Sequence, residues 1–96
     1  MSNVSVIIYT MKGCPHCTEL KKKLDEQNIE YYDRDIFEYS DEYQIFVEIT
    51  DNDLVPSLLI IEGDETNYES HVYVPDVHYN DINEAVGIIL EHKKNN

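Results

Sequence analysis

The sequence lacks any long hydrophobic run, and its apolar residues occur in short blocks such as residues 4–9 and 58–61. A membrane-spanning helix needs about 20 consecutive apolar residues, so neither a membrane span nor a membrane partner is expected. The first five residues also lack the basic stretch and apolar core of a secretory signal. These absences together predict a cytoplasmic protein.

Basic side chains are scarce, with seven Lys and Arg against 20 Asp and Glu, which gives a formal net charge of −13. A surface of this sign repels the phosphates of nucleic acids over about a Debye length. Nucleic acid is therefore excluded as an expected partner. A self-repelling surface also agrees with a soluble protein, which we expect to be a monomer.

Cysteine is limited to Cys14 and Cys17, which are three positions apart. A bridge across so short a loop would constrain the unfolded chain very little, so the disulfide-scaffold class is excluded. A zinc site would need two more ligands, and His71 and His78 do not have the usual spacing for them. We expect no metal and no bound cofactor, and we interpret the pair as redox-active thiols. At 96 residues, the chain is long enough for one domain, residues 1–96.

The hydrophobic pattern predicts alternating strands and helices. Residues 4–10 have the composition of a strand that is buried on both faces, and residues 30–37 form a second strand. Residues 58–61 and 68–74 flank a Gly-Asp turn and predict an antiparallel hairpin. The order of elements is therefore β-α-β-α-β-β-α.

Three helices complete this order. The first covers residues 18–28, the second runs from a Ser40 cap to about residue 50, and the third follows a capping box at Asp81 and Glu84. Their predicted apolar faces contain, in turn, Cys17, Leu20 and Leu24; Ile45, Phe46 and Ile49; and Ile82, Ala85, Val86, Ile89 and Leu90.

The cysteine pair lies where the first strand gives way to the first helix. Pro15 suits a first helical turn, which places Cys14 at or just before the helix N-terminus. Unpaired N–H groups and the helix dipole favour a thiolate there, and His16, if protonated, would add positive charge. Cys14 is therefore the predicted nucleophile. Cys17, one turn later and more buried, is the predicted resolving thiol.

Three features together resemble the thioredoxin fold in its glutaredoxin form: the Cys14-Pro15-His16-Cys17 motif after a strand, the Val55-Pro56 pair before an apolar strand, and the order of elements. The resemblance implies a thioredoxin-like α/β fold with a central mixed four-stranded sheet flanked by helices. It also implies a thiol–disulfide oxidoreductase that takes part in electron transport, with Cys14, Pro15, His16 and Cys17 as the redox-active centre.

The same resemblance implies a substrate site around the motif. The Val55–Pro56 bond is expected to be cis, so that the Val55 backbone can pair with an extended substrate. Lys12 is expected to meet a substrate carboxylate. Tyr9 stands just upstream of the motif, and this position in the sequence predicts that it lines the groove. The segment that binds the γ-glutamyl end of glutathione corresponds best to Asp76 and Val77.

The chain departs from the glutaredoxin pattern at several positions, which leaves alternatives open. Glutaredoxins typically have Tyr at the position of His16, Thr at that of Leu54, and a Gly-Gly pair that residues 74–78 lack. The leading hypothesis is a dithiol glutaredoxin that uses glutathione as co-substrate and reduces glutathione mixed disulfides or protein disulfides, for example in a ribonucleotide reductase. The alternatives are a thioredoxin-like hydrogen donor recharged by a flavoprotein reductase, and a non-catalytic thioredoxin-fold binding module.

Overall fold

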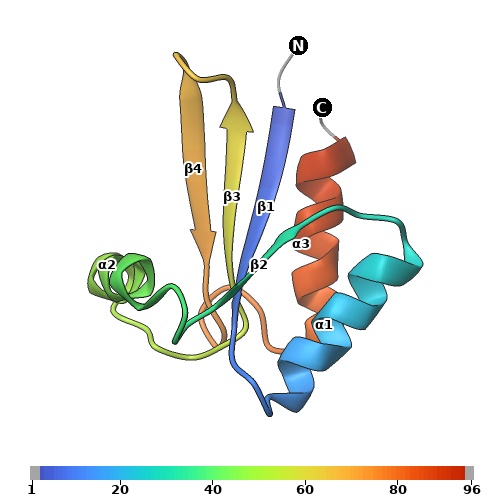
Figure 1. Cartoon of the computed structure of the whole chain (residues 1–96). Helices are drawn as coiled ribbons and strands as arrows, with labels where there is room; N and C mark the ends of the chain where they lie inside the picture. Colours follow the sequence, from blue (N-terminus) through green and yellow to red (C-terminus); the bar gives the residue numbers. More distant parts are fainter. Residues whose placement is uncertain (1–2, 95–96) are drawn as a thin grey trace.

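The structure is a computed structural model that describes residues 3–94, and its elements follow the predicted order. The strands are β1 (Asn3–Thr10), β2 (Tyr32–Asp35), β3 (Ser57–Gly63) and β4 (Tyr68–Tyr73), and the helices are α1 (Pro15–Glu26), α2 (Ser40–Thr50) and α3 (Ile82–Lys94). Figure 1 shows the sheet between α2 on one side and α1 with α3 on the other. No helix within the described range is long and apolar enough to cross a membrane.

The four strands form one mixed sheet in the order β2-β1-β3-β4. The central strand β1 pairs in parallel with β2 and antiparallel with β3, and β3 pairs antiparallel with β4. Residues 6–10 of β1 are all buried, as expected for a strand that has neighbours on both edges and helices on both faces. The predicted central strand, late hairpin and mixed sheet are thus confirmed.

Each face of the sheet has its own hydrophobic cluster. The larger cluster lies under α1 and α3, and the smaller one lies under α2. The buried members of the larger cluster are Val6, Ile8, Leu20, Leu24, Leu58, Ile60, Tyr79, Ile82, Ala85, Val86 and Ile89. Those of the smaller cluster are Ile7, Tyr9, Phe46 and Val74. The alternation of successive β1 residues between the two clusters follows from the period of two in a strand.

Two predictions about α2 are wrong. Ser40 is the first helical residue rather than the cap, and the Tyr39 side chain at the cap position makes no capping hydrogen bond. Of the predicted apolar face, only Phe46 is buried, whereas Ile45 and Ile49 are 58% and 70% exposed. A single helix on this face leaves no second helix to cover the rest of the stripe.

Two other elements have shifted ends, and one apolar position of α3 is not buried. The first helix begins at Pro15, in agreement with the first turn predicted there, but it ends at Glu26 rather than at residue 28. The edge strand β2 has only four residues, which are half-buried or exposed. Leu90 of α3 lies outside the buried face of its helix.

Candidate active site

Cys14 occupies the N-cap of α1, immediately before Pro15 at the first helical position. A turn closed by the Cys14 N–H and the Met11 carbonyl, with Gly13 at φ +79°, brings the chain from β1 to this cap. The Cys14 Sγ accepts the backbone N–H of Cys17 at 3.2 Å, as a serine or aspartate oxygen would at an ordinary cap. An N–H donor aimed at the sulfur stabilises negative charge on it. The predicted position of Cys14 is thus confirmed.

Cys17 lies one turn further along α1 and is 1% exposed, against 8% for Cys14. Burial, followed by the side-chain hydrogen bond with Cys14, raises the pKa of the Cys17 thiol to about 12. The charge of Cys14 raises this pKa further, while a backbone hydrogen bond with Met11 and the Lys21 ammonium oppose the shift. The deeper thiol is therefore protonated at neutral pH.

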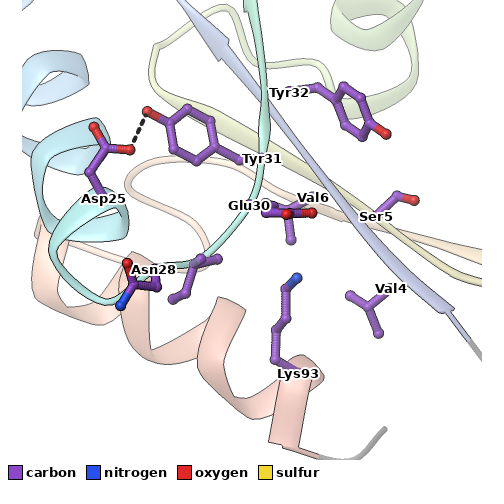
Figure 2. A pocket seen from close by; sticks show the side chains of 10 residues that line it. Val4, Ser5, Val6, Asp25, Asn28, Glu30, Tyr31, Tyr32 and Lys93 are labelled. Atoms are coloured by element: carbon purple, nitrogen blue, oxygen red, sulfur yellow. Dashed lines mark hydrogen bonds between the residues drawn. The ribbon is translucent and has the colours of Figure 1, made fainter.

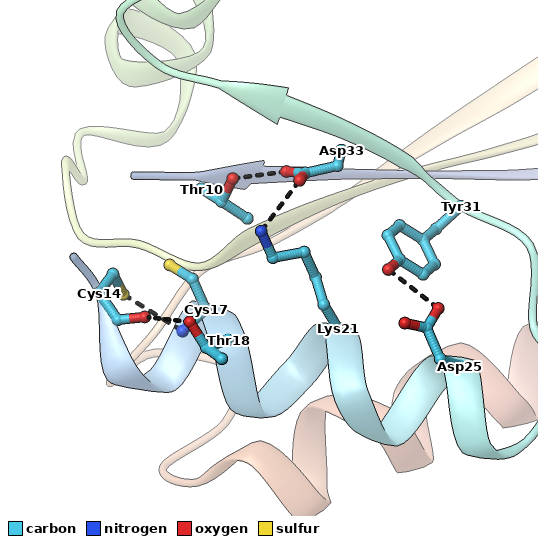
Figure 3. A network of polar contacts seen from close by, with 8 residues as sticks. All are labelled: Thr10, Cys14, Cys17, Thr18, Lys21, Asp25, Tyr31 and Asp33. Atoms are coloured by element: carbon cyan, nitrogen blue, oxygen red, sulfur yellow. Dashed lines mark hydrogen bonds and ion pairs between the residues drawn. The ribbon is translucent and has the colours of Figure 1, made fainter. Parts of the chain in front are cut away.

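A polar network lies beside the cysteine pair (Figure 3). Asp33 of β2 accepts the Thr10 hydroxyl at 2.5 Å and the Lys21 ammonium at 3.0 Å. Lys21 follows Cys17 by one turn of α1, so the helix itself brings a cation near the buried thiol. Sequence reasoning missed this lysine, although its i, i+4 spacing from Cys17 could have indicated it.

The Val55–Pro56 peptide bond is cis, as the resemblance implied. Buried Tyr79 donates its hydroxyl to the Pro56 carbonyl. On the other side of the bond, the Ser57 hydroxyl donates to the Leu54 carbonyl at 2.6 Å. The Asn52 side chain accepts the Leu54 N–H at 2.9 Å and donates to the Pro75 carbonyl at 3.1 Å. The cis-proline loop is therefore fixed from both ends, and Tyr79 is a second residue that sequence reasoning missed.

A cleft of about 410 Å³ opens between the start of α1, the cis-proline loop and the start of α3. Its acidic lining residues are Glu19, Asp76 and Asp81, and none of its lining residues in the described chain is Lys or Arg. The full lining is His16, Glu19, Leu54, Val55, Pro56, Pro75, Asp76, Tyr79, Asn80, Asp81, Ile82 and Asn83. The cleft thus joins the cysteine motif, through His16, to the Val55-Pro56 pair.

Asp81 reaches this cleft because it caps α3. Its carboxylate accepts the Glu84 N–H at 2.8 Å, and the Glu84 carboxylate accepts the Asn80 N–H at 2.8 Å. The predicted capping box therefore forms, with its return bond one residue earlier than usual.

The remaining predicted site residues take different positions. His16 is exposed, and its Nδ1 lies 3.9 Å from a Glu19 oxygen. Lys12 is also exposed. Asp76 lines the cleft with a left-handed φ of 67°, whereas Val77 is exposed outside the cleft lining.

Tyr9 does not line the cleft, so this part of the predicted site is wrong. Its ring is 1% exposed and packs on Tyr43 and Phe46 on the α2 face. The hydroxyl donates to Glu42. Burial and then this hydrogen bond raise the pKa of Tyr9. Because β1 alternates between faces, Tyr9 points away from the face that α1 covers.

A larger hollow of about 790 Å³ lies away from the cysteines, between the first half of β1, the end of α1 and Lys93 of α3 (Figure 2). Tyr31 lines it and donates its hydroxyl to Asp25 at 3.0 Å. No thiol is among its lining residues in the described chain. Size alone therefore does not locate the reactive site.

Comparison with known proteins agrees with this geometry. Three solved structures resemble the chain: thioredoxin from Trichomonas vaginalis, with 11% identity and a TM-score of 0.59; glutaredoxin from Brucella melitensis, with 21% identity and a TM-score of 0.50; and a malarial protein, with 16% identity and a TM-score of 0.52. The alignments cover 97%, 95% and 94% of this chain and 79%, 84% and 97% of the others, respectively. At these identities the likeness establishes the thioredoxin-like fold.

The family assignment comes from the sequence itself. A search of the curated proteins found no significant match. The sequence profile of the glutaredoxin family matches residues 6–64, which include the cysteine motif and the cis-proline. The chain therefore belongs to the glutaredoxin family, and this membership supports a thiol–disulfide oxidoreductase activity.

Proposed function

We propose that the chain is a dithiol oxidoreductase that reduces glutathione mixed disulfides and protein disulfides through Cys14 and Cys17. The observation that carries the proposal is the Cys14 sulfur at the N-cap of α1, with the Cys17 N–H aimed at it and the protonated Cys17 thiol behind it. Cys14 is thus placed to attack the substrate, and Cys17 stays protonated until the second step.

In the first step, the Cys14 thiolate attacks one sulfur of the substrate disulfide. A mixed disulfide forms on Cys14, the substrate S–S bond breaks, and the other sulfur leaves as a thiolate that takes up a proton. With a glutathione mixed disulfide, the protein thiol leaves and glutathione stays on Cys14. A second glutathione can then attack this adduct, which releases glutathione disulfide and restores the Cys14 thiolate.

With a protein disulfide, Cys17 completes the reaction. Two causes of its raised pKa are the hydrogen bond with Cys14 and the charge of Cys14. Both end when Cys14 becomes a neutral mixed disulfide, so the pKa of Cys17 falls at the moment when its thiolate is needed. The Cys17 thiolate then attacks the Cys14 sulfur, and the substrate leaves as a dithiol. The cysteine pair is thereby oxidised to a Cys14–Cys17 disulfide. Lys21 stabilises the transient Cys17 anion.

The cis-proline loop would align the substrate. Half-buried Val55 and buried Pro56 line the same cleft as His16, where an extended chain could pair with the Val55 backbone. Glutathione as the electron donor and a disulfide protein such as a ribonucleotide reductase as the target are parts of the proposal. So is a cytoplasmic location, because a reductase needs a compartment that keeps thiols reduced.

The charge of the cleft favours a second candidate, a thioredoxin-like donor recharged by a flavoprotein reductase. Glutathione carries two carboxylates, whereas the cleft presents Glu19, Asp76 and Asp81 without a lining Lys or Arg in the described range.

Replacing Glu19 with Gln should lower the KM for a glutathione mixed disulfide by about two- to fivefold, the effect of one surface charge. Glu48→Gln on the exposed side of α2 is the matched control. An unchanged KM in Glu19→Gln would show that glutathione does not bind in this cleft.

The decisive experiment compares turnover of a glutathione mixed disulfide, with glutathione and its reductase, with insulin reduction by a thioredoxin reductase system. Cys14→Ser should abolish both activities. Cys17→Ser should lose insulin reduction but keep part of the glutathione activity, because only the protein disulfide needs a resolving thiol. Activity that survives in Cys14→Ser would contradict the assigned nucleophile. Activity on insulin alone would identify the thioredoxin-like donor.

A further inference from the structure

A cluster of three metal-ligating side chains lies outside the active site. Glu62 of β3, His71 of β4 and His92 of α3 each offer one ligand atom within 4.8 Å of the other two. Their side chains are 26%, 32% and 15% exposed, respectively. From the last turn of α3, His92 contacts Glu62 and Tyr73 of the β3–β4 hairpin.

The cluster lies towards the end of the sheet opposite to the cysteines. Glu62 is next to the last residue of β3, and His92 lies in the last turn of α3. Figure 1 shows both of these ends at the top of the molecule, whereas β1 runs down to the cysteine loop at the bottom. The cluster is therefore independent of the thiol chemistry.

The hydrogen bonds of His92 depend on which ring nitrogen carries the proton. With the proton on Nδ1, His92 donates to the Glu62 carboxylate and accepts the Tyr73 hydroxyl. The His92 Nε2 lies 2.6 Å from the Tyr73 hydroxyl, and the Nδ1 is in close contact with a Glu62 carboxylate oxygen. When a neutral imidazole carries its proton on Nε2 and donates it to Tyr73, the Nδ1 lone pair faces the carboxylate. In this second tautomer, a metal ion bound to both atoms makes the contact favourable.

His71 supplies a third donor to the same place. Its Nε2 is buried and makes no hydrogen bond to any residue from 3 to 94. Glu69 makes an ion-pair contact with it at 3.7 Å, which is longer than a hydrogen bond. The His71 and His92 rings lie 4.9 Å apart between centroids. A buried polar atom without a hydrogen bond is costly, so this nitrogen indicates a ligand.

We propose that Glu62, His71 and His92 bind one zinc ion, with Tyr73 as the hydrogen-bond partner that orients His92. Two imidazoles and one carboxylate form a donor set that zinc uses, with a fourth position left to water. Zinc–ligand bonds of about 2.1 Å put tetrahedral ligand atoms roughly 3.4 Å apart, so rotations of these side chains by about 1 Å close the site. The bound ion links the last turn of α3 to the β3–β4 hairpin.

The position of Tyr73 strengthens the assignment. A histidine that binds a metal through one nitrogen usually donates the other N–H to a fixed acceptor, which sets its tautomer and its orientation. The hydroxyl of Tyr73, half-buried on β4, lies where it accepts an Nε2–H once Nδ1 binds a metal beside Glu62. The overall charge of −13 also favours a divalent cation over a neutral ligand.

The test is a zinc titration by calorimetry on the full, chelator-treated chain. Thiolates bind zinc, so the chain is used once oxidised and once with Cys14 and Cys17 replaced by serine. This background makes the result independent of the proposed redox function. One zinc ion should bind in both forms with a Kd in the micromolar range or tighter, and no binding at millimolar zinc would overturn the proposal.

Variants locate the ion. His71→Gln and the isosteric Glu62→Gln should each weaken zinc binding at least tenfold, whereas His16→Gln, which removes an exposed histidine, should not. Tyr73→Phe should keep one ion per chain but weaken it by about 10- to 100-fold, the usual effect of losing such a partner. Circular dichroism identifies any variant that fails to fold. If one of the two ligand variants is unfolded, the zinc affinity of the other one tests the site. Equal zinc affinity in wild type, His71→Gln and Glu62→Gln would overturn the site.

Cobalt gives a direct spectroscopic readout. Tetrahedral Co²⁺ should produce visible absorption bands in the wild type and in His16→Gln, and these bands should be lost in His71→Gln. Bands that persist in His71→Gln would place the ion elsewhere and overturn the assignment.

Discussion

On one face of the sheet, α1 and α3 bury a large set of mostly aliphatic side chains, whereas on the other face α2 buries only Phe46 and adds polar contacts through Glu42. Leu20, Leu24, Ala85 and Ile89 are fully buried on the first face. On the second face, Arg34 and Tyr9 both bond to Glu42 of α2. The cysteine motif and the start of α3 belong to the well-packed face, and no cleft residue in the described chain comes from α2. The site is thus built on the face with the larger hydrophobic cluster.

The largest expected effect is a loss of stability on the α1 and α3 face. Leu24→Ala should lower the free energy of unfolding by about 3 kcal/mol, because it opens a cavity that the surrounding side chains cannot close. Ile49→Ala on α2, where the side chain is 70% exposed, is the matched control and should change stability by less than about 0.5 kcal/mol. Urea unfolding measures both. Equal losses in the two variants would remove the contrast between the faces.

A second prediction concerns how the well-packed face supports the cis-proline loop. Tyr79→Phe removes the only side-chain hydrogen bond that the described residues show to the buried Pro56 carbonyl. We expect a loss of about 2 kcal/mol, because the carbonyl is left without this donor. Insulin reduction should show a raised KM, since Pro56 lines the cleft.

Tyr68→Phe is the matched control for Tyr79→Phe, because Tyr68 is exposed on β4. It should leave both stability and KM unchanged. A Tyr79→Phe protein with a normal KM and lower stability would show that the hydrogen bond supports the fold without shaping the site.

The same contrast explains what the sequence could predict. The position of Cys14 depends on local signals, a strand followed by Gly13 and by Pro15 at a first helical turn, and the structure agrees. The face of α3 was also predictable, because four of its five apolar positions are buried. On α2 the same periodicity failed, since a helical stripe does not reveal how much of it another element covers.

The parts of the site that come from distant segments could not be predicted. Tyr79 and Pro56 meet across 23 residues, and Thr10 meets Asp33 across the same separation. The position of Tyr9 just before the motif predicts a place in the groove, but strand alternation turns its side chain to the other face. Such contacts depend on the pairing of strands and on the packing of helices, which local patterns do not specify.

The smallest expected loss of stability is on the α2 face, where the Glu42 carboxylate binds two side chains from the sheet. Arg34 donates to both Glu42 oxygens at 2.6 Å, and Tyr9 donates to one of them. Burial alone would raise the pKa of Glu42, but the hydrogen bonds from Arg34 and Tyr9 together lower it below its ordinary value of 4.5. Glu42→Gln should therefore cost about 1 kcal/mol at pH 7, after allowance for solvent screening of this half-buried pair.

The pH dependence of this cost separates it from simple packing. A group with a lowered pKa in the folded state contributes its full stability above the unfolded pKa, near 4.5, and loses it as the pH falls through the folded value. The difference in unfolding free energy between wild type and Glu42→Gln should therefore be constant from pH 7 to about pH 5.5 and shrink at lower pH. Urea unfolding at a series of pH values measures it, with exposed Glu48→Gln on the same helix as the control. If this free-energy difference stays constant down to pH 3, the charge of the Glu42 carboxylate does not stabilise α2. The two faces of the sheet would then differ less than their contacts indicate.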